Sequence, residues 1–392
     1  MLKEIVLAGG SRTPIGSLSG TLADVPAPTL GSVAIKAAIE RAKLPAERVD
    51  EVFVGNVLGA GCGQNVARQA AIGAGLSVNV GATTVNKVCG SGLKSVMLAA
   101  QATQCGDVSV VVAGGTESMS RAPYLLDRAR AGYRMGHGKI IDSMIHDGLW
   151  DVYNDLHMGI CGDRCATKYA FTRQQQDDFA VESYQRARRA AAQGVFANEI
   201  VPVEVARKKG TITIAEDEEP LRFDEEKLRA LRPAFDQQGT VTAGNASSIN
   251  DGAAAVIVLS ADTAGELGVR PQARILGYAT ASIEPEWFTI APIAAIRRLL
   301  SHLSITVDRV DCWEINEAFS VVAMVAMKEL AIPHEKVNVH GGAVALGHPI
   351  GASGTRTLVT LLNAMEQRDA GIGVVSLCIG GGEAVALAVE KS

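Results

Sequence analysis

The sequence predicts an α/β protein made of two repeated α/β halves, and repetition along the chain is the main reason. A strand, helix, strand series opens the first half, over residues 3–9, 34–42 and 47–56. The same series returns in the second half, over residues 273–278, 294–303 and 308–316. The start of the last strand, Asp-Arg-Val-Asp, nearly copies the Glu-Arg-Val-Asp that starts its counterpart. Strand patterns that alternate with helical patterns are typical of sheets covered by helices.

A second series repeats in the same order and strengthens this prediction. In the first half it is a strand, a helix and a strand, over residues 84–89, 92–104 and 108–112, followed by a pair of glycines. In the second half it occupies residues 337–340, 354–365 and 374–377, followed by three glycines. We therefore expect matching elements in both halves, with a strand at residues 337–340.

The segment between the halves is more polar and more charged, and we interpret it as an insertion. It contains one long helical pattern, from Thr172 to Gln193. Thr172 and Gln175 have the spacing of a capping box, and Gly194 follows as a stop. A strand pattern then resumes the first half. The predicted organisation is a first half of residues 1–119 with 249–271, an inserted loop domain of residues 120–248, and a second half of residues 272–392.

Composition excludes several classes of protein. The 392 residues suffice for two or three domains with their own cores. With 47% apolar residues and no apolar run near the ~20 residues of a membrane span, we expect no membrane segment. A net charge of −5 argues against a nucleic-acid partner. Seven scattered cysteines and an N-terminus without a leader pattern favour a reducing cytoplasm. Cys161 and Cys165 have the spacing of metal ligands, but no second pair with zinc spacing follows them, so we expect no metal site.

Two cysteines lie where strand patterns end. Cys89, in Val88-Cys-Gly-Ser-Gly92, precedes a helical pattern, where a tight turn exposes the side chain and a helix N-terminus favours the thiolate. The alternative is a small apolar side chain buried at a turn. Cys378 has no cysteine at its counterpart in the first half, so the strand itself does not require a thiol. It is either a second acid and base or one member of a redox pair.

Two polar residues are candidates to work with these thiols. His348 lies in a run with five glycines in fourteen residues, 341–354, again before a helical pattern. This placement makes it the candidate base for Cys89, and the alternative of a phosphate cradle is weak because no Gly-Lys-Ser/Thr follows. Asn316 follows a strand pattern and is either a helix N-cap or the anchor of an oxyanion-binding water.

Four motifs, in this order and at these separations, resemble those of the thiolase family. They are Val88-Cys-Gly-Ser-Gly92, Asn316-Glu-Ala-Phe319, the glycine-rich run 341–354 and Leu377-Cys-Ile-Gly-Gly-Gly382. The likeness covers essentially the whole chain. Three runs of the insertion are similar to the biosynthetic, acetoacetyl-CoA branch of the family: Tyr133-Arg-Met-Gly136, His157-Met-Gly159, and Arg232-Pro-Ala-Phe-Asp236 with Thr242-Ala-Gly-Asn-Ala-Ser247.

The resemblance implies a role for individual residues. Cys89 would be the acylated nucleophile, His348 its base, and Cys378 the acid and base at the substrate α-carbon. Asn316 would hold a water in one oxyanion hole together with His348, and the backbone N–H groups of Cys89 and Gly380 would form the other. The residues implied to contact substrate and coenzyme A are Ser247, Arg222, His157, Met158, Phe235, Ala243 and Phe319.

The resemblance also implies a fold, an assembly and a reaction. The fold is five-layered, αβαβα, with a loop-domain insertion, and the assembly is a homotetramer, a dimer of dimers, with residues near 121–141 as the tetramer loop. The reaction is the reversible condensation of two acetyl-CoA to acetoacetyl-CoA and coenzyme A, by a ping-pong route through an acetyl-cysteine. Coenzyme A is then substrate and product, and no cofactor or metal is needed.

Competing functions share much of this sequence pattern. One is a degradative 3-ketoacyl-CoA thiolase with a broader acyl range, and another is a non-catalytic lipid-binding scaffold. The presence of all four chemical positions argues against the scaffold. A ketoacyl-carrier-protein synthase would have His or Asn in place of Cys378. Met158 predicts a short acyl pocket, whereas Phe288-Thr-Ile-Ala-Pro292 departs from the Met-Gly-x-Gly-Pro of many thiolases.

Overall fold

The first half of the chain forms one part of a ten-stranded mixed sheet. The computed structural model describes residues 3–392, so Met1 and Leu2, which the first predicted half includes, lie outside the described residues. In sheet order the strands are β1 (Ile5–Arg12), β12 (Asn250–Ser260), β5 (Val110–Ser118), β3 (Glu51–Gly55) and β4 (Gly81–Val85), with β2 (Gly16–Ser17) paired to β12. The strand predicted at residues 250–259 is β12, and it lies antiparallel between β1 and β5.

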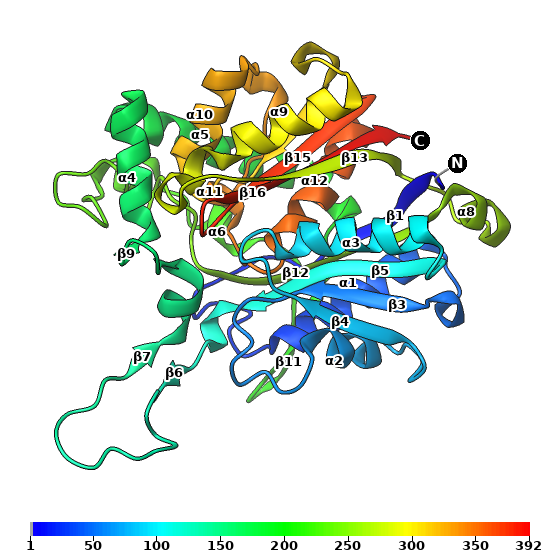
Figure 1. The fold of residues 1–392 in the computed structure, drawn as a ribbon, viewed down its shortest axis with the longest axis horizontal. Coiled ribbons are helices and arrows are strands. Elements are labelled where there is room, and N and C mark those ends of the chain that lie inside the picture. Colours follow the sequence, from blue (N-terminus) through cyan, green and yellow to red (C-terminus); the bar gives the residue numbers. More distant parts are fainter. Residues whose placement is uncertain (1–2) are drawn as a thin grey trace.

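The second half of the chain continues the sheet with four more strands. In sheet order they are β14 (Cys312–Ile315), β15 (Ile372–Ile379), β16 (Glu383–Lys391) and β13 (Ala273–Ser282). The two groups of strands are joined where β13 pairs with β1 over two residue pairs. Because this junction is short, the groups turn away from each other and form two separate layers (Figure 1).

Helices form the other three layers. α1 (Ala27–Ala42) and α2 (Val66–Gly73) cover the outer face of the first group of strands. α9 (Ala291–Leu303) covers the second group, and α10 (Ser320–Leu330) packs beside α9. α3 (Ser91–Cys105) and α12 (Ser353–Arg368) lie between the two groups (Figure 1). Buried apolar side chains fill the space on both faces of each group. The predicted five-layered αβαβα arrangement is therefore confirmed.

The remaining elements are short or belong to the segment predicted as an insertion. The helices are α4 (Met158–Tyr169), α5 (Arg173–Ala192), α6 (Glu218–Leu221), α7 (Glu225–Ala230), α8 (Ala261–Leu267) and α11 (Ala343–Leu346). The strands are β6 (Tyr124–Leu125), β7 (Ile141–Asp142), β8 (Trp150–Asp151), β9 (Leu156–His157), β10 (Val203–Arg207) and β11 (Gly210–Ile214). Short 3₁₀ turns span Ala46–Arg48, Met119–Arg121, Val195–Asn198, Pro285–Ile290, Val307–Arg309 and His334–Lys336, and a π-helical turn spans Met144–Leu149.

Local sequence explains the bounds of the long helix α5 (Arg173–Ala192). The Thr172 side chain accepts a hydrogen bond from the backbone of Gln175, and the Gln175 side chain accepts one from the backbone of Thr172. This reciprocal pair satisfies two N–H groups that a helix start leaves unpaired. At the other end, Gly194 adopts a φ of +71°, which a glycine allows at no steric cost. The predicted capping box and stop are both confirmed.

The strand predicted at residues 337–340 is wrong. Val337 forms a single bridge with Trp313, and the chain then turns at Asn338, whose φ is +48°. The Asn338 side chain donates to the Ile315 carbonyl at 2.8 Å and accepts from the Ile315 N–H at 2.9 Å. A side-chain amide thus makes the hydrogen bonds that a neighbouring strand would make with the edge of β14.

The middle layer depends on direct contact between the backbones of α3 and α12. A Cβ added to Gly354 would lie 2.2 Å from the Leu93 nitrogen, and one added to Gly92 would lie 2.8 Å from the Thr355 nitrogen. These separations are shorter than any real Cβ contact, so both positions require glycine. The contact places the N-termini of the two helices side by side, together with the loops that precede them.

We expect Gly354→Ala to destabilise the fold, because the added methyl group would overlap the backbone nitrogen of Leu93. The free energy of unfolding should fall by about 1–3 kcal/mol, measured by urea denaturation. Gly265→Ala in α8 is the matched control, since its added Cβ would meet no atom within 4 Å. That control should be neutral or slightly stabilising. Equal denaturation midpoints for Gly354→Ala and the unsubstituted protein would contradict the close-contact argument.

Candidate active site

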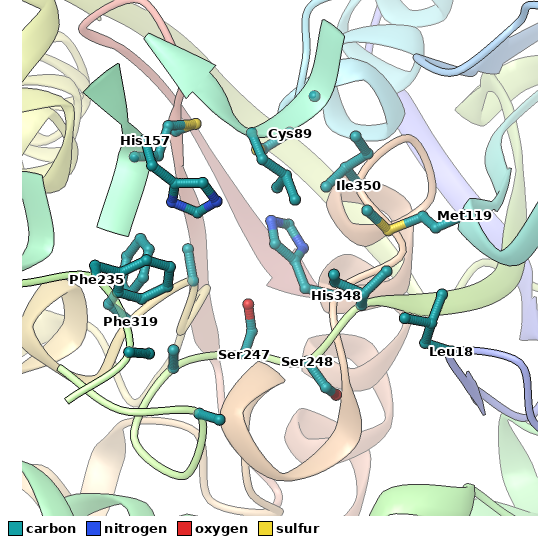
Figure 2. Close-up of a pocket in the computed structure, with 18 of the residues that line it drawn as sticks. Leu18, Cys89, Met119, His157, Phe235, Ser247, Ser248, Phe319, His348 and Ile350 are labelled. Carbon is teal, nitrogen blue, oxygen red and sulfur yellow. The ribbon is translucent and has the colours of Figure 1, made fainter. Parts of the chain in front are cut away.

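A cavity of about 470 Å³ is lined by residues from all along the chain, among them Cys89, several residues between 148 and 249, and His348. Most of its lining is apolar, with a few polar side chains. Figure 2 shows the rings of His157 and Phe235 on one side of the cavity, across from His348. Nine of the twelve residues singled out in the sequence line it: Cys89, His157, Met158, Arg222, Phe235, Ala243, Ser247, Phe319 and His348.

Cys89 lies in a tight turn between β4 and α3. The residue before it, Val88, has a φ of +45°, a left-handed conformation that is rare for a β-branched side chain. Burial raises the pKa of the Cys89 thiol to about 11, although the N–H groups of Gly380 and Cys89 itself act to lower that pKa. The backbone N–H groups at the helix start favour the thiolate, as expected, but burial outweighs them at this site. Cys89 is a neutral thiol that needs a base.

His348 is held in the form that such a base requires. The Ser353 hydroxyl donates to the Pro349 carbonyl at 2.9 Å, so it accepts from His348 Nδ1, which lies 2.5 Å away. The proton of the neutral ring is then on Nδ1, and Nε2 keeps its lone pair. Burial, with the nearby charge of Arg356, lowers the pKa of His348 to about 3. The ring is consequently neutral at physiological pH and can accept a proton.

Asn316 lies directly behind this imidazole. Its Nδ2 is 3.5 Å from His348 Nε2, and its Oδ1 is buried with no hydrogen-bond partner among residues 3–392. The alternative reading of Asn316 as a helix N-cap is wrong, because α10 begins only at Ser320 with Phe319 at the N-cap. The next residue, Glu317, is buried and accepts hydrogen bonds from Ser183, Asn338 and the backbone of Val344. These bonds hold the loop that carries Asn316 in place.

Cys378 and Gly380 come from the end of β15 and the turn after it. They do not line the cavity but lie directly behind it. Cys378 is buried, and both this burial and the neighbouring Cys89 raise the pKa of its thiol well above the usual range. The backbone N–H of Gly380 is near enough to the Cys89 thiol to lower its pKa, and a Cβ added to Gly380 would lie 3.2 Å from the Met158 Cε. The two thiols therefore share one buried site, and both are free.

The other side of the cavity is built by the start of α4. His157 caps this helix with its Nδ1, which accepts from the Gly159 N–H at 3.0 Å, and its ring stacks on Phe235 with centroids 4.6 Å apart. A Cβ added to Gly159 would overlap the Phe235 ring at 2.2 Å, so this glycine is required. Phe288 and Phe319 meet edge to face with ring centroids 6.3 Å apart, and both line the cavity together with Met158.

Several residues of the site were not singled out in the sequence. Glu117 is buried in β5 and accepts from Asn56, from the Val57 and Leu58 N–H groups and from the Gly351 N–H, which joins the loop after β3 to the loop of His348. Asn250 accepts from the His348 N–H at 2.8 Å, and Ser353 orients the imidazole. Glu117 had only a weak sequence signal, an acidic residue shortly after the apolar run of residues 110–113. Ser353 belongs to the glycine-rich run 341–354, but the sequence analysis gave it no role. No sequence pattern pointed to Asn250.

The described residues contain no cluster of three or more His, Cys, Asp or Glu side chains that could hold a metal ion. Cys161 and Cys165 lie one turn apart on α4, and both are buried. Between residues 3 and 392, no helix is both long enough and apolar enough to cross a membrane.

We expect Ser353→Ala to slow alkylation of Cys89 by iodoacetamide. Loss of the Nδ1–H acceptor frees the imidazole to carry its proton on Nε2, where it cannot accept one. The rate at Cys89, followed by peptide mass mapping at neutral pH, should fall roughly 10- to 100-fold. Thr357→Ala is the matched control, because it removes a buried hydroxyl of α12 that bonds only to the Ser353 and Gly354 carbonyls. An unchanged rate in Ser353→Ala would contradict the assigned tautomer.

Comparison with known proteins places this geometry in a family. Residues 5–262 match the family model "Thiolase, N-terminal domain", and residues 269–391 match "Thiolase, C-terminal domain". The chain is 52% identical to an acetyl-CoA acetyltransferase of Cupriavidus necator over 392 residues, the whole of both chains. It is 50% identical to that of Escherichia coli, again over the whole of both. A crystal structure of Acat5 thiolase from Ascaris suum in complex with coenzyme A, 44% identical, superposes with a TM-score of 0.95 over the whole of both chains. The chain therefore belongs to the thiolase family.

Proposed function

We propose that this protein is an acyltransferase that converts two molecules of acetyl-CoA reversibly into acetoacetyl-CoA and coenzyme A. One observation supports the proposal above the others: Cys89 lines the cavity beside the His348 imidazole, whose Nε2 is a base, and a second buried thiol, Cys378, neighbours Cys89 outside that lining. The full-length relatives named acetyl-CoA acetyltransferase and the coenzyme A complex of the Ascaris thiolase support it.

In the first half-reaction, His348 Nε2 accepts the Cys89 proton as the sulfur attacks the thioester carbonyl of acetyl-CoA. Negative charge develops on the carbonyl oxygen, and the N–H groups of Cys89 and Gly380, which lie near the Cys89 thiol, stabilise it. The carbon–sulfur bond to coenzyme A then breaks, and Cys378 donates a proton to the departing thiolate. The products are acetyl-Cys89, free coenzyme A, a protonated His348 and a Cys378 thiolate.

In the second half-reaction, the Cys378 thiolate removes a proton from the methyl group of a second acetyl-CoA. Its high pKa makes it a strong enough base for this weak carbon acid. The enolate oxygen is stabilised by a water held on Asn316 and by protonated His348. The new carbanion attacks the acetyl carbonyl on Cys89, the carbon–carbon bond forms, and the Cys89 thiolate leaves and recovers its proton from His348.

Binding of coenzyme A is proposed along the wall that the inserted segment contributes. Ser247, His157, Ala243 and Arg222 line the cavity that Cys89 also lines, and the Arg222 guanidinium pairs with Glu218. Phe235, Phe319 and Met158 surround the reacting end. Coenzyme A is substrate and product in this scheme, and no cofactor or metal takes part.

The proposed assembly is a homotetramer, a dimer of dimers, in the cytoplasm. The arm around β6 and β7 extends away from the body of the molecule (Figure 1) and carries exposed apolar side chains, among them Met135, which is 98% exposed. Large exposed apolar side chains favour a contact with another chain. We retain the division into residues 1–119 with 249–271, an inserted loop domain, 120–248, and residues 272–392 as part of the proposal.

The first test separates the two thiols. After incubation with acetyl-CoA and an acid quench, mass mapping should find the acetyl group on Cys89. Cys378→Ala should still form acetyl-Cys89 but neither exchange the methyl protons of acetyl-CoA nor condense it, because the α-carbon base is absent. Cys161→Ala is the matched control, a buried thiol on α4 outside the lining of the cavity. Acetylation confined to another cysteine, or full condensation by Cys378→Ala, would contradict the assignment.

The second test concerns acyl-chain length. The bulky side chains of Met158, Phe288 and Phe319 line the cavity, so thiolysis of 3-ketoacyl-CoA should fall steeply between four-carbon and eight-carbon substrates. Since one methylene in an apolar pocket is worth only about 1–3 kcal/mol, the fall should show as steric exclusion in kcat/KM. Met158→Ala should restore part of the eight-carbon activity. Equal or rising kcat/KM along the series would instead favour a degradative thiolase of broad range.

A further inference from the structure

An ion pair joins the two halves of the chain beside the site. Lys87 Nζ donates to both carboxylate oxygens of Glu383, each at 2.7 Å, although the two residues are 296 positions apart. The side chains are 19% and 32% exposed, so water screens the pair only in part. Ser282 adds a hydrogen bond to the same carboxylate at 3.3 Å. Two bonds to one ammonium group fix the distance between the backbones that carry these side chains.

The pair connects the two loops that meet at the Cys89 sulfur. Lys87 lies two residues before Cys89, and Glu383 lies three residues after Gly380, at the start of β16. The loops belong to different groups of strands, since β4 and β16 are not neighbours in the sheet. Backbone hydrogen bonds of a ladder therefore do not set the position of Gly380 relative to Cys89.

Packing between these loops is close and depends on small residues. A Cβ added to Gly90 would lie 2.3 Å from the Ile379 Cδ1, and one added to Gly380 would lie 3.7 Å from the Val88 Cγ1. Val88 also holds the strained φ of +45°. A conformation of this kind persists only where the surroundings fix it, and the ion pair acts on the residue directly before it.

We propose that Lys87 and Glu383 are positioning residues, whose ion pair holds the Gly380 N–H at the Cys89 sulfur and so assembles the oxyanion site. The inference rests on the proposed role of Gly380 as an oxyanion donor. Neither side chain lines the cavity, so they act through the two loops and not on the substrate. An oxyanion donor is effective only at hydrogen-bond distance, so a small displacement of this loop reduces the rate sharply.

Two reactions of Cys89 distinguish this role from a general one. Acetylation by acetyl-CoA passes through an oxyanion, whereas alkylation by iodoacetamide does not. In Glu383→Gln and Lys87→Met, the acetylation rate should fall at least about tenfold, with alkylation of Cys89 and the KM for acetyl-CoA little changed. The double variant Lys87→Glu with Glu383→Lys should recover much of the acetylation rate, because it restores an ion pair between the same loops.

Lys94→Met is the matched control. Lys94 lies on α3, is a second cation near the ion pair, and does not bond to Glu383. Its acetylation rate should match that of the unsubstituted protein. Acetylation by Glu383→Gln and Lys87→Met within twofold of that rate would overturn the proposal. An equal loss of acetylation and alkylation, together with a lower Tm, would also overturn it, because the ion pair would then only stabilise the fold. Glu383→Gln conserves shape, so it tests the charge even where Lys87→Met fails to fold. Failure of the unsubstituted protein to acetylate Cys89 at all would contradict the proposed function instead.

Discussion

Gly92 on α3 and Gly354 on α12 bring two helix backbones into direct contact at the centre of the molecule, and the site exists because of this contact. Each helix is preceded by a loop that carries one reacting side chain, Cys89 before α3 and His348 before α12. Side chains at the two glycines would separate the helices and carry the loops apart with them. The repetition of one strand, loop and helix unit in both halves therefore has a chemical result, because two copies of the same turn face each other across a shared layer.

The site is built almost entirely from neutral groups. Burial raises the pKa of the Cys89 thiol to about 11 and lowers the pKa of His348 to about 3, so neither carries a charge before substrate binds. A buried charge without a partner is costly, and this arrangement avoids one. Charge then appears only during the reaction, where fixed N–H donors and a held water can stabilise it. Hydrogen bonds between neutral groups, such as the one from His348 to Ser353, orient the reacting side chains themselves.

Much of the fold could be predicted because the repeats carry local signals. Strand patterns, the capping box of α5 and the glycines that end helices all act over a few neighbouring residues. The strand expected at residues 337–340 failed because Asn338 makes its bonds to Ile315, a residue 23 positions earlier that no local pattern reveals. The neutral state of the Cys89 thiol has a related reason. A helix N-terminus is visible in a sequence, whereas the degree of burial that outweighs it depends on the whole fold.

The residues of the site likewise divide into those that a local pattern reveals and those that depend on distant contacts. Motif residues such as Cys89 and His348 were recognisable because their chemistry is tied to their own loops. Glu117 and Lys87 were not singled out, because their importance comes from partners far along the chain, Gly351 and Glu383. Spacing within a motif identifies the group that reacts. It does not identify the side chains that hold two motifs at a working distance.

The hydrogen bonds of Asn338 also close part of one edge of the sheet. At one end, the Asn338 side chain already occupies the N–H and carbonyl of Ile315, so the outer edge of β14 is closed to another strand at that point. At the other end, β4 is the edge strand of the sheet, and the Asn65 side chain donates to one of its backbone groups, the Ala82 carbonyl, at 2.9 Å. An edge strand is a template for pairing with a further strand. A side-chain amide thus occupies backbone groups at each edge of this sheet, two at Ile315 and one at Ala82.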